Sequence, residues 1–315
     1  MRNMLIEKLN KSLEMENIKG NIKKNHALAG MTWFKVGGNA EVFFQPEDVS
    51  EMQKFLRILP KKIPLQVLGA GSNILVRDGG IDGVVLNLGK RFSNINIGKD
   101  FFVSVGAGAN CIKLARDLAE LEIKGLEFFS GIPGTIGGAI KMNSGAYKSQ
   151  TSDRLVSIKS VDRSGNIIEL EKKDYIMEYR RTNFPDDLIF YEATFSCESG
   201  RKKELLDKIS VLNEKRTKTQ PIKKNTGGST FKNPTNNKAW KLIKESGCSQ
   251  LKIGGAYVSE LHSNFIVNNG NASSSDIEQL GEEIKKRVRN KSGINLEWEI
   301  HIVGKQKKSK EVLYD

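Results

Sequence analysis

Two glycine-rich stretches contain the residue types and spacing that suggest chemistry. The longer one, residues 128–147, has five glycines and one proline among small side chains, and the shorter one covers residues 68–74. Glycine permits positive φ angles and lets a ligand approach the backbone without a Cβ in the way. Consecutive N–H groups in such loops form a concave nest for phosphate oxygens. Two loops of this kind on one chain favour a large dinucleotide as the ligand.

These loops do not follow the common nucleotide-binding motifs. No Gly-Lys-Ser/Thr follows the longer loop and G-x-G-x-x-G is absent from it, so neither a P-loop nor a Rossmann fingerprint is predicted. Taken alone, the longer stretch has an alternative interpretation as a glycine-rich crossover in a large sheet. The second loop shifts the balance toward ligand binding.

Residues 69–73 and 130–138 resemble the FAD-binding loops of the UDP-N-acetylenolpyruvoylglucosamine reductase (MurB) family. The resemblance extends from about residue 32 to residue 303. It implies an α+β chain, with a two-lobed FAD-binding domain of the PCMH/vanillyl-alcohol-oxidase type and a C-terminal α+β substrate-binding domain. The cofactor contacts that it implies are Gly69, Ala70, Gly71, Ser72, Asn73, Ile74, Gly131, Pro133, Gly134, Thr135, Gly137, Gly138, Asn143 and Gly145.

The resemblance also implies an activity. The family's flavoenzymes use NADPH to reduce UDP-N-acetylglucosamine enolpyruvate to UDP-N-acetylmuramate in peptidoglycan precursor synthesis, hence in cell wall biogenesis. Hydride passes from FAD N5 to C3 of the enolpyruvyl group, and a proton is added at C2. An alternative enzyme would be another flavoprotein of this fold, such as an alcohol oxidase. An alternative outside enzymes is a basic nucleotide- or RNA-binding protein, which would lack the yellow colour of flavin.

Residues 227–234 read Gly-Gly-Ser-Thr-Phe-Lys-Asn-Pro. By itself, a serine after two glycines is most simply an ordinary turn residue. The segment resembles the family motif Gly-Ser-x-Phe-Lys-Asn-Pro, which contains a proton-donating serine. The resemblance therefore implies that Ser229 is the general acid, with Lys232 and Asn233 near the sugar nucleotide.

Tyr179 to Phe184 resemble the family's Tyr-Arg-x-Ser-x-Phe, with Thr182 where serine is usual. The resemblance implies that Arg180 polarises the substrate, and a planar guanidinium suits this role because it grips a carboxylate through two parallel hydrogen bonds. Without the motif, a surface ion pair would be the simpler interpretation. Only about fifty residues separate Arg180 from Ser229, too few for the insertion of the type I enzymes. The chain therefore resembles a type II enzyme.

Residues 296–302 alternate between apolar and polar side chains, which is typical of a half-buried strand. Glu297 and Glu299 would then point the same way. The family's C-terminal motif Leu-Glu-x-Glu-Val/Ile implies that the second acid, Glu299, is catalytic. His301 stands where a basic residue is common, and we assign it no role.

Length and composition narrow the class of protein. The 315 residues suffice for two or three domains, and 38% of them are hydrophobic. No apolar run approaches the roughly 20 residues of a membrane span, and no signal peptide is predicted, so we expect a cytoplasmic protein without a membrane partner. Three cysteines far apart predict neither a disulfide nor a zinc site, and His26 and His262 lack partners at metal-ligand spacing.

The formal net charge of +13 has three interpretations: nucleic-acid binding, attraction of polyanionic small molecules, and a compositional bias toward Lys and Asn. The basic residues are spread along the chain and no nucleic-acid motif accompanies them. We therefore expect a small-molecule substrate and no nucleic-acid partner. We also expect a monomer.

The elements that position these residues follow from apolar periodicity. Helices are predicted at residues 3–17, 46–59, 112–121, 202–216 and 239–246 and from residue 276, the last with a capping box of Ser275 and Glu278. Strands are predicted at residues 42–44, 65–68, 83–88, 101–105, 155–161, 167–170, 188–195, 256–258, 264–267 and 296–303.

The predicted domains follow the chain. An N-terminal helical arm covers residues 1–30, and the FAD-binding domain covers 31–200, with lobes of about 31–80 and 81–200. A linking helix at 201–220 leads to the substrate-binding domain at 221–305 and a basic tail at 306–315.

Overall fold

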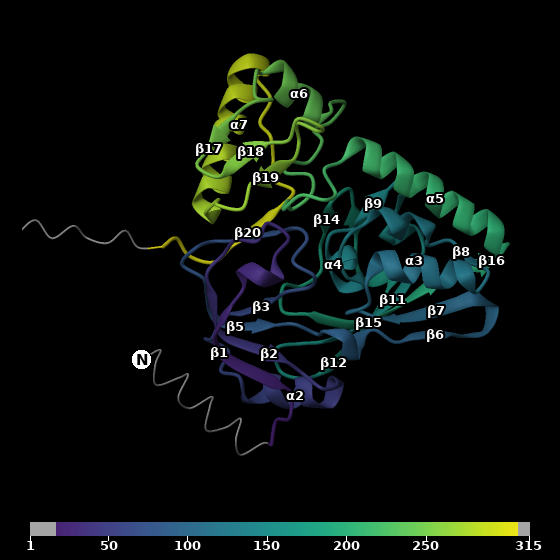
Figure 1. Ribbon diagram of the computed structural model, residues 1–315. Coiled ribbons are helices and arrows are strands. Elements are labelled where there is room, and N and C mark those ends of the chain that lie inside the picture. Colours follow the sequence, from purple (N-terminus) through teal and green to yellow (C-terminus); the bar gives the residue numbers. More distant parts are fainter. Residues whose placement is uncertain (1–16, 308–315) are drawn as a thin grey trace, which may run out of the picture. The chain divides into compact units, whose positions relative to one another are not determined.

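The computed structural model describes residues 17–307, and Figure 1 shows its helices and strands. The predicted helix at residues 3–17 and the predicted tail lie almost entirely outside the described residues. The described residues form two compact units. The first comprises residues 17–23, 43–70 and 85–218, and the second comprises residues 24–42, 71–84 and 219–307. Parts of the predicted lobe 31–80 thus group with the C-terminal residues.

The first unit contains a five-stranded antiparallel sheet of order β12-β11-β15-β7-β6. Helix α4 packs against β15 and β7, and α3 lies beside it on the same side of the sheet (Figure 1). The bounds are β6 Ile95–Ile97, β7 Phe102–Gly106, β11 Leu155–Val161, β12 Ile167–Glu171, β15 Ile189–Ser196, α3 Cys111–Glu120, α4 Ile136–Lys141 and α5 Lys202–Thr219.

A four-stranded sheet has the order β1-β2-β5-β3. Its strands are β1 Asn21–Ala27, β2 Asn39–Gln45, β3 Leu65–Val67 and β5 Ile81–Leu86. Helix α2 covers Val49–Ile58, later than the start predicted at Pro46. The reason is the cap, because the side chain of Asp48 accepts a hydrogen bond from the amide of Glu51 at 2.8 Å.

The second unit is built around helix α7, Ser274–Ser292. Its predicted apolar stripe of Ile277, Leu280, Ile284 and Val288 is fully buried. The stripe packs in one core with helix α6, Ala239–Glu245, and a sheet of order β17-β18-β19. These strands are β17 Lys252–Ile253, β18 Ala256–Val258 and β19 Ile266–Asn268.

The cap of α7 differs from the prediction. The box is formed by Ser273 and Asp276, two residues upstream of the predicted pair. The predicted Ser275 lies inside the helix, and its backbone amide donates a hydrogen bond to the carboxylate of Asp78 at 3.2 Å. As predicted, the box consists of a serine and an acidic residue three positions later. Because several serines follow one another here, the sequence alone does not show which of them is the cap.

The predicted strand at residues 296–303 is wrong over its first half. Only β20, His301–Val303, is a strand, and it pairs in parallel with β4, Ile74–Val76. Before it, Trp298 forms an isolated bridge to Phe231. The chain therefore changes partners, and it bends at Glu299 and Ile300 to do so.

The remaining strands are pairs of residues, too short for a period of two to be visible in the sequence. They are β8 Ile123–Lys124, β9 Gly145–Ala146, β10 Ser149–Gln150, β13 Met177–Glu178, β14 Arg181–Thr182 and β16 Glu198–Ser199. Short 3₁₀ helices lie at Ala29–Met31, Lys90–Phe92, Lys99–Phe101, Glu127–Gly131, Thr151–Asp153 and Lys172–Asp174.

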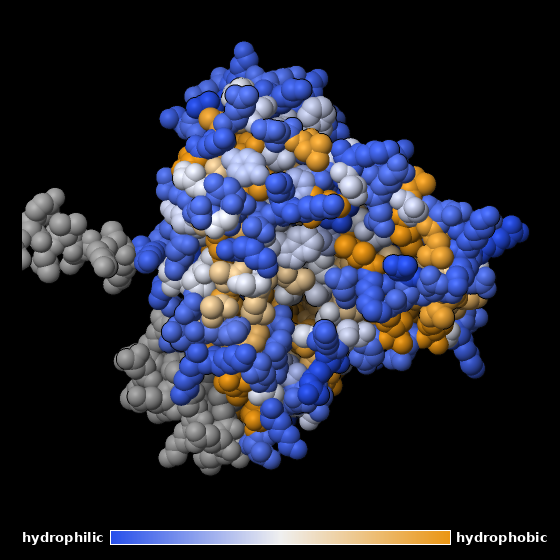
Figure 2. Space-filling view, in the orientation of Figure 1, coloured by the Kyte–Doolittle hydropathy of each residue, from blue (hydrophilic) through white to orange (hydrophobic). Residues whose placement is uncertain are grey.

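The visible face is mostly hydrophilic, with small apolar groups between the polar residues (Figure 2). Across residues 17–307, no helix combines the length and the apolar character that crossing a bilayer requires.

Candidate functional site

The two glycine loops meet within the first unit. A Cβ on Gly69 would lie 2.6 Å from the hydroxyl oxygen of Thr135, a distance that real Cβ contacts do not show. The side-chain amide of buried Asn87 donates to the carbonyl oxygens of Leu68 at 2.6 Å and Gly69 at 3.1 Å, which fixes the end of the shorter loop. Loops far apart in sequence thus lie against each other, and glycine is needed at the point of contact.

The longer loop is shaped by close packing. A Cβ on Gly131 would lie 2.6 Å from the ring of Tyr147, and Gly134 has a φ of 145°. The hydroxyl of Ser130 is buried, and among the described residues it has no hydrogen-bond partner. An unpaired buried hydroxyl costs free energy unless another group satisfies it. An orphaned hydroxyl in a glycine-rich loop fits a bound ligand such as FAD.

Arg180 lies at the end of this longer loop. Its guanidinium donates to the carbonyl oxygens of Gly145 at 2.9 Å and Asn143 at 3.3 Å, and it lies 5.1 Å from the ring centre of Tyr179. Asn143 is fully buried, and its side chain donates to the carbonyl oxygen of Glu178 at 2.9 Å. The predicted cofactor contact Asn143 thus holds the segment that carries Arg180.

Thr182, which stands where the family motif has a serine, has a hydrogen-bonded hydroxyl. The Thr182 hydroxyl donates to the carbonyl oxygen of Lys141 at 2.9 Å, as a serine hydroxyl could. Between Arg180 and Ser229 the structure contains β14, β15, β16 and α5. These elements account for most of the interval, in agreement with the absence of an insertion.

The second unit contains the rest of the shorter loop, from Gly71 to Ile74. Gly71 has a φ of 65°, and a Cβ there would lie 2.1 Å from the carbonyl oxygen of Met31. Asn73 faces the C-terminal region. Its side-chain amide donates to the carbonyl oxygen of Glu299 at 3.0 Å, and its own carbonyl accepts from the amide of His301 at 3.1 Å.

Ser229 follows two glycines that serve different purposes. A Cβ on Gly227 would lie 2.4 Å from the ring of Phe34, whereas Gly228 has a φ of 84° and open space around it. After Ser229, the amide of Thr230 donates to the carbonyl oxygen of Asn264 at 2.8 Å. The chain therefore turns sharply at Gly228 and is fixed again directly after the serine.

Glu299 lies beside this serine segment. Its backbone amide donates to the carbonyl oxygen of Thr230 at 2.9 Å, and its side chain is half-buried. Glu297 differs, because its side chain is 76% exposed and lies 3.4 Å from the ammonium of Lys232. The structure thus separates two acids that the alternating pattern treats alike.

The two predicted substrate contacts have structural partners. The backbone amide of Lys232 donates a hydrogen bond to the carbonyl oxygen of Glu297 at 2.9 Å. Asn233 is exposed, and its side-chain oxygen accepts from the amide of Ala239 at 3.0 Å, at the start of α6.

The structure therefore groups the predicted site residues by unit. Arg180 lies with the longer loop in the first unit, and Ser229 and Glu299 lie with Asn73 in the second. Sequence reasoning missed Asn87 and Asn264, buried asparagines that hold loop backbone. A polar side chain inside an apolar run was the available signal, because a buried amide requires hydrogen-bond partners.

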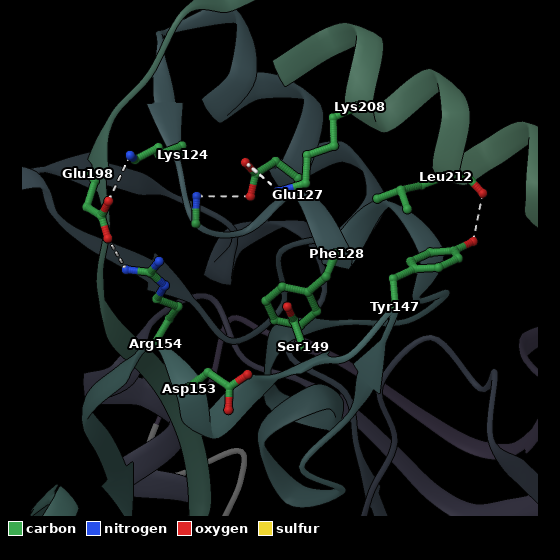
Figure 3. A pocket seen from close by; sticks show the side chains of 11 residues that line it. Lys124, Glu127, Phe128, Tyr147, Ser149, Asp153, Arg154, Glu198, Lys208 and Leu212 are labelled. Carbon is green, nitrogen blue, oxygen red and sulfur yellow. Dashed lines mark hydrogen bonds and ion pairs between the residues drawn. The ribbon is translucent and has the colours of Figure 1, made fainter. Parts of the chain in front are cut away.

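A pocket of about 560 Å³ lies in the first unit, and two of the residues that line it, Phe128 and Tyr147, belong to the longer glycine loop (Figure 3). The carboxylate of Glu198 lies 2.9 Å from the ammonium of Lys124 and 2.6 Å from the guanidinium of Arg154. Hydrogen bonds from Arg154 and Lys124 lower the pKa of Glu198 to about 2. Lys208 faces Glu127 at 3.3 Å, so the pocket's cations have carboxylate partners.

The three cysteines are not placed for nucleophilic chemistry. Cys111, Cys197 and Cys248 are buried and unbridged, and burial raises the pKa of each thiol. A thiol that resists ionisation is a poor nucleophile. Within residues 17–307, no group of three His, Cys, Asp or Glu side chains is arranged to hold a metal ion.

Comparisons with known proteins identify both regions. Residues 220–303 match the model for the C-terminal domain of UDP-N-acetylenolpyruvoylglucosamine reductase, and residues 40–171 match an FAD binding domain. The chain is 46% identical to the UDP-N-acetylenolpyruvoylglucosamine reductase of Parvibaculum lavamentivorans, over 93% of this chain and 94% of that protein. It is 47% identical to the one of Rickettsia typhi, over 91% and 97%.

A solved structure is also similar. The crystal structure of UDP-N-acetylenolpyruvylglucosamine reductase (MurB) from Thermus caldophilus aligns with a TM-score of 0.78 and 29% identity, and covers 90% of this chain and 99% of that one. These matches confirm the predicted fold class, an FAD-binding domain joined to a C-terminal domain of mixed helices and strands.

Proposed function

Because this chain belongs to the UDP-N-acetylenolpyruvoylglucosamine reductase family of FAD-dependent oxidoreductases, we propose that it reduces UDP-N-acetylglucosamine enolpyruvate to UDP-N-acetylmuramate with NADPH. The reaction serves peptidoglycan precursor synthesis. The observation that supports the proposal is the bond between the Glu299 amide and the Thr230 carbonyl, because Thr230 directly follows Ser229, the proposed proton donor.

The residues that would hold FAD are those of the two glycine loops. The contact at Gly69 and Thr135 brings the loops together, and the orphaned Ser130 hydroxyl lies within the longer one. The chemistry that FAD supplies when bound is hydride transfer, from NADPH to its N5 atom and from there to C3 of the enolpyruvyl group.

Arg180 would bind the carboxylate of the enolpyruvyl group. Its guanidinium is oriented by the carbonyls of Asn143 and Gly145, so little ordering remains to be done when the substrate binds. A fixed cation aimed at the carboxylate also stabilises the negative charge that develops there when C3 receives a hydride.

Glu299 would stabilise the enolate that forms when C3 receives a hydride. A carboxyl group stabilises an enolate oxygen only by sharing a proton with it, so Glu299 would hold that proton on a carboxyl oxygen. The backbone of Glu299 is bonded on both sides, by Thr230 and by Asn73. These two hydrogen bonds limit the movement of Glu299. Proton transfer requires such a fixed position.

Ser229 would donate its hydroxyl proton to C2. A hydroxyl is a weak acid in water, so the alkoxide left on Oγ needs a nearby cation. Lys232 lies three residues on, and its ammonium is 3.4 Å from the mostly exposed carboxylate of Glu297. An ion pair of this kind contributes little free energy, so its loss on substrate binding would cost little.

The test of this function is a steady-state assay. The purified protein, NADPH and UDP-N-acetylglucosamine enolpyruvate are mixed, and the loss of nicotinamide absorbance is followed. Oxidation of NADPH that requires the enolpyruvyl substrate and yields UDP-N-acetylmuramate supports the proposal. Oxidation that is indifferent to the substrate contradicts it.

We further propose that the enzyme works as a monomer in the cytoplasm and binds no nucleic acid. The net charge of +13 suits a substrate that carries a diphosphate and a carboxylate, because opposite charge speeds encounter. Light scattering with and without RNA would test the monomer and the absence of nucleic-acid binding together.

A further inference from the structure

Asn264 uses its whole side chain on the backbone of one residue. Its Oδ1 accepts from the amide of Phe231 at 3.0 Å, and its Nδ2 donates to the carbonyl oxygen of Phe231 at 2.8 Å. Asn264 is 4% exposed and Phe231 is fully buried. The side-chain amide thus makes the two backbone hydrogen bonds that a neighbouring strand would otherwise make. It fixes the backbone at Phe231, two residues after Ser229.

The same segment is held along both edges. On the side of Asn264, the amide of Ile266 donates to the hydroxyl of Thr230 at 3.2 Å. On the opposite side, the carbonyl of Thr230 accepts from Glu299, and the amide of Lys232 donates to Glu297, both at 2.9 Å. The clamp by Asn264 therefore sets where residues 230–232 lie relative to the segment that carries Glu299.

Directly before Ser229, Gly228 packs against no other residue that the structure describes. Gly228 has a positive φ, and a Cβ there would meet nothing within 4 Å. Glycine also has the greatest backbone freedom of any residue. Thr230, directly after Ser229, is bonded to Asn264, whereas the first contact upstream is the packing of Gly227 against Phe34. Ser229 is therefore held most directly from its downstream side.

We propose that Asn264 is a positioning residue for proton transfer, which fixes Ser229 relative to Glu299. The inference rests on the proposed function, because it assigns a purpose to the serine of that reaction. Asn264 acts through Phe231 and does not itself exchange a proton with the substrate. Misplacement of a catalytic group by about 1 Å can cost on the order of 100-fold in rate.

The chain offers a matched control at Thr226. Its hydroxyl donates to the carbonyl oxygen of Ile266 at 2.7 Å, and the residue is 4% exposed, as Asn264 is. Both bonds hold the serine loop to the region of β19, but Thr226 lies upstream of the glycine pair. Thr226→Val therefore removes a buried hydrogen bond without releasing the segment after Ser229.

The experiment compares Asn264→Leu, Thr226→Val and Ser229→Ala with the wild-type holoenzyme. FAD content, thermal unfolding, the rate of flavin reduction by NADPH and the rate of flavin reoxidation by substrate are measured. We expect Asn264→Leu to slow reoxidation by about 10- to 100-fold, with FAD content and flavin reduction unchanged. The solvent deuterium effect on reoxidation should rise, because protonation becomes more rate-limiting. Thr226→Val should lower the unfolding temperature but leave reoxidation near the wild-type rate.

The outcomes separate this inference from the proposed function. Normal reoxidation in Asn264→Leu, or equal slowing in Thr226→Val, overturns the inference while Ser229→Ala remains slow. Normal reoxidation in Ser229→Ala overturns the proposed role of the serine, and the role of Asn264 with it. If Asn264→Leu does not fold, Asn264→Gln takes its place, since its longer side chain keeps the amide but displaces Phe231. The same rates then decide the inference.

Discussion

The side-chain amide of Asn73 donates a hydrogen bond to the backbone carbonyl of Glu299 at 3.0 Å, although the two residues lie 226 positions apart. Asn73 belongs to the shorter glycine loop, and its own carbonyl accepts from His301. Together with the bond from Glu299 to Thr230, this contact fixes Glu299 from two directions. Glu297, two residues earlier, has a mostly exposed side chain.

This difference predicts unequal effects at the two acids. Glu299→Gln keeps the shape of the side chain but cannot exchange a proton, so substrate reduction should slow by about 100-fold or more while flavin reduction by NADPH survives. Glu297→Gln loses only an exposed ion pair and should change the rate little. Stopped-flow absorbance of the flavin measures both. Equal effects, or a reversed order, would withdraw the assignment of Glu299.

Ser229→Ala should divide the reaction into its two halves. Flavin reduction by NADPH should proceed at nearly the wild-type rate, because the serine takes no part in it. Reoxidation by the enolpyruvyl substrate should fall by about 100- to 10,000-fold, the usual contribution of a positioned proton donor. The same stopped-flow instrument follows each half. Reoxidation at the wild-type rate would place the acid elsewhere.

Gly69→Val should reduce the FAD content of the purified protein. The added Cβ would lie 2.6 Å from the Thr135 hydroxyl, so the two glycine loops would have to separate. Gly30→Ala is the control, because a Cβ at Gly30 meets nothing within 4 Å. The ratio of flavin absorbance to protein absorbance measures the content. Full occupancy in Gly69→Val would show that contact of the loops is not required for the cofactor.

The ion cluster around Glu198 predicts a pH dependence of stability. Its pKa is lowered from 4.5 to about 2 by Arg154 and Lys124. Because the pKa of Glu198 is lower in the folded state than in the unfolded chain, its ionised form stabilises the fold at any pH above the unfolded-state pKa. This stabilisation is lost as the pH falls from about 4.5 toward 2. In urea unfolding, Glu198→Gln should therefore be less stable than wild type at pH 7, and the difference should shrink between these two pH values. A difference that is constant with pH would contradict the ion pairing.

Long periodic elements could be predicted from the sequence, because the apolar residues on their buried face recur at a regular spacing. The stripe of α7 and the hairpin of β11 and β12 are confirmed, since each shows its buried face within a few residues. The strand at residues 296–303 failed for the opposite reason. Its first half pairs with residues 230–232 and its second half with β4, and such a change of partner leaves no mark on a regular alternation.

The candidate site was predictable only in part. Motifs identified Ser229, Arg180 and Glu299 as residues of interest, but their roles stay predictions that the experiments above test. No motif assigned a role to Asn264 or Asn87, whose side chains bond to backbone far away in the sequence. A hydrogen bond from a side chain to a distant backbone group has no periodicity, so only the folded chain reveals it.

The central claim is that the flavin transfers its reducing equivalents to the enolpyruvyl substrate, and a single-turnover measurement tests it most directly. The holoenzyme is reduced under anaerobic conditions with one equivalent of NADPH and then mixed with UDP-N-acetylglucosamine enolpyruvate. We predict that the absorbance of oxidised flavin returns and that one equivalent of UDP-N-acetylmuramate forms per flavin. Flavin that stays reduced until oxygen is admitted, with no product formed, would contradict the account.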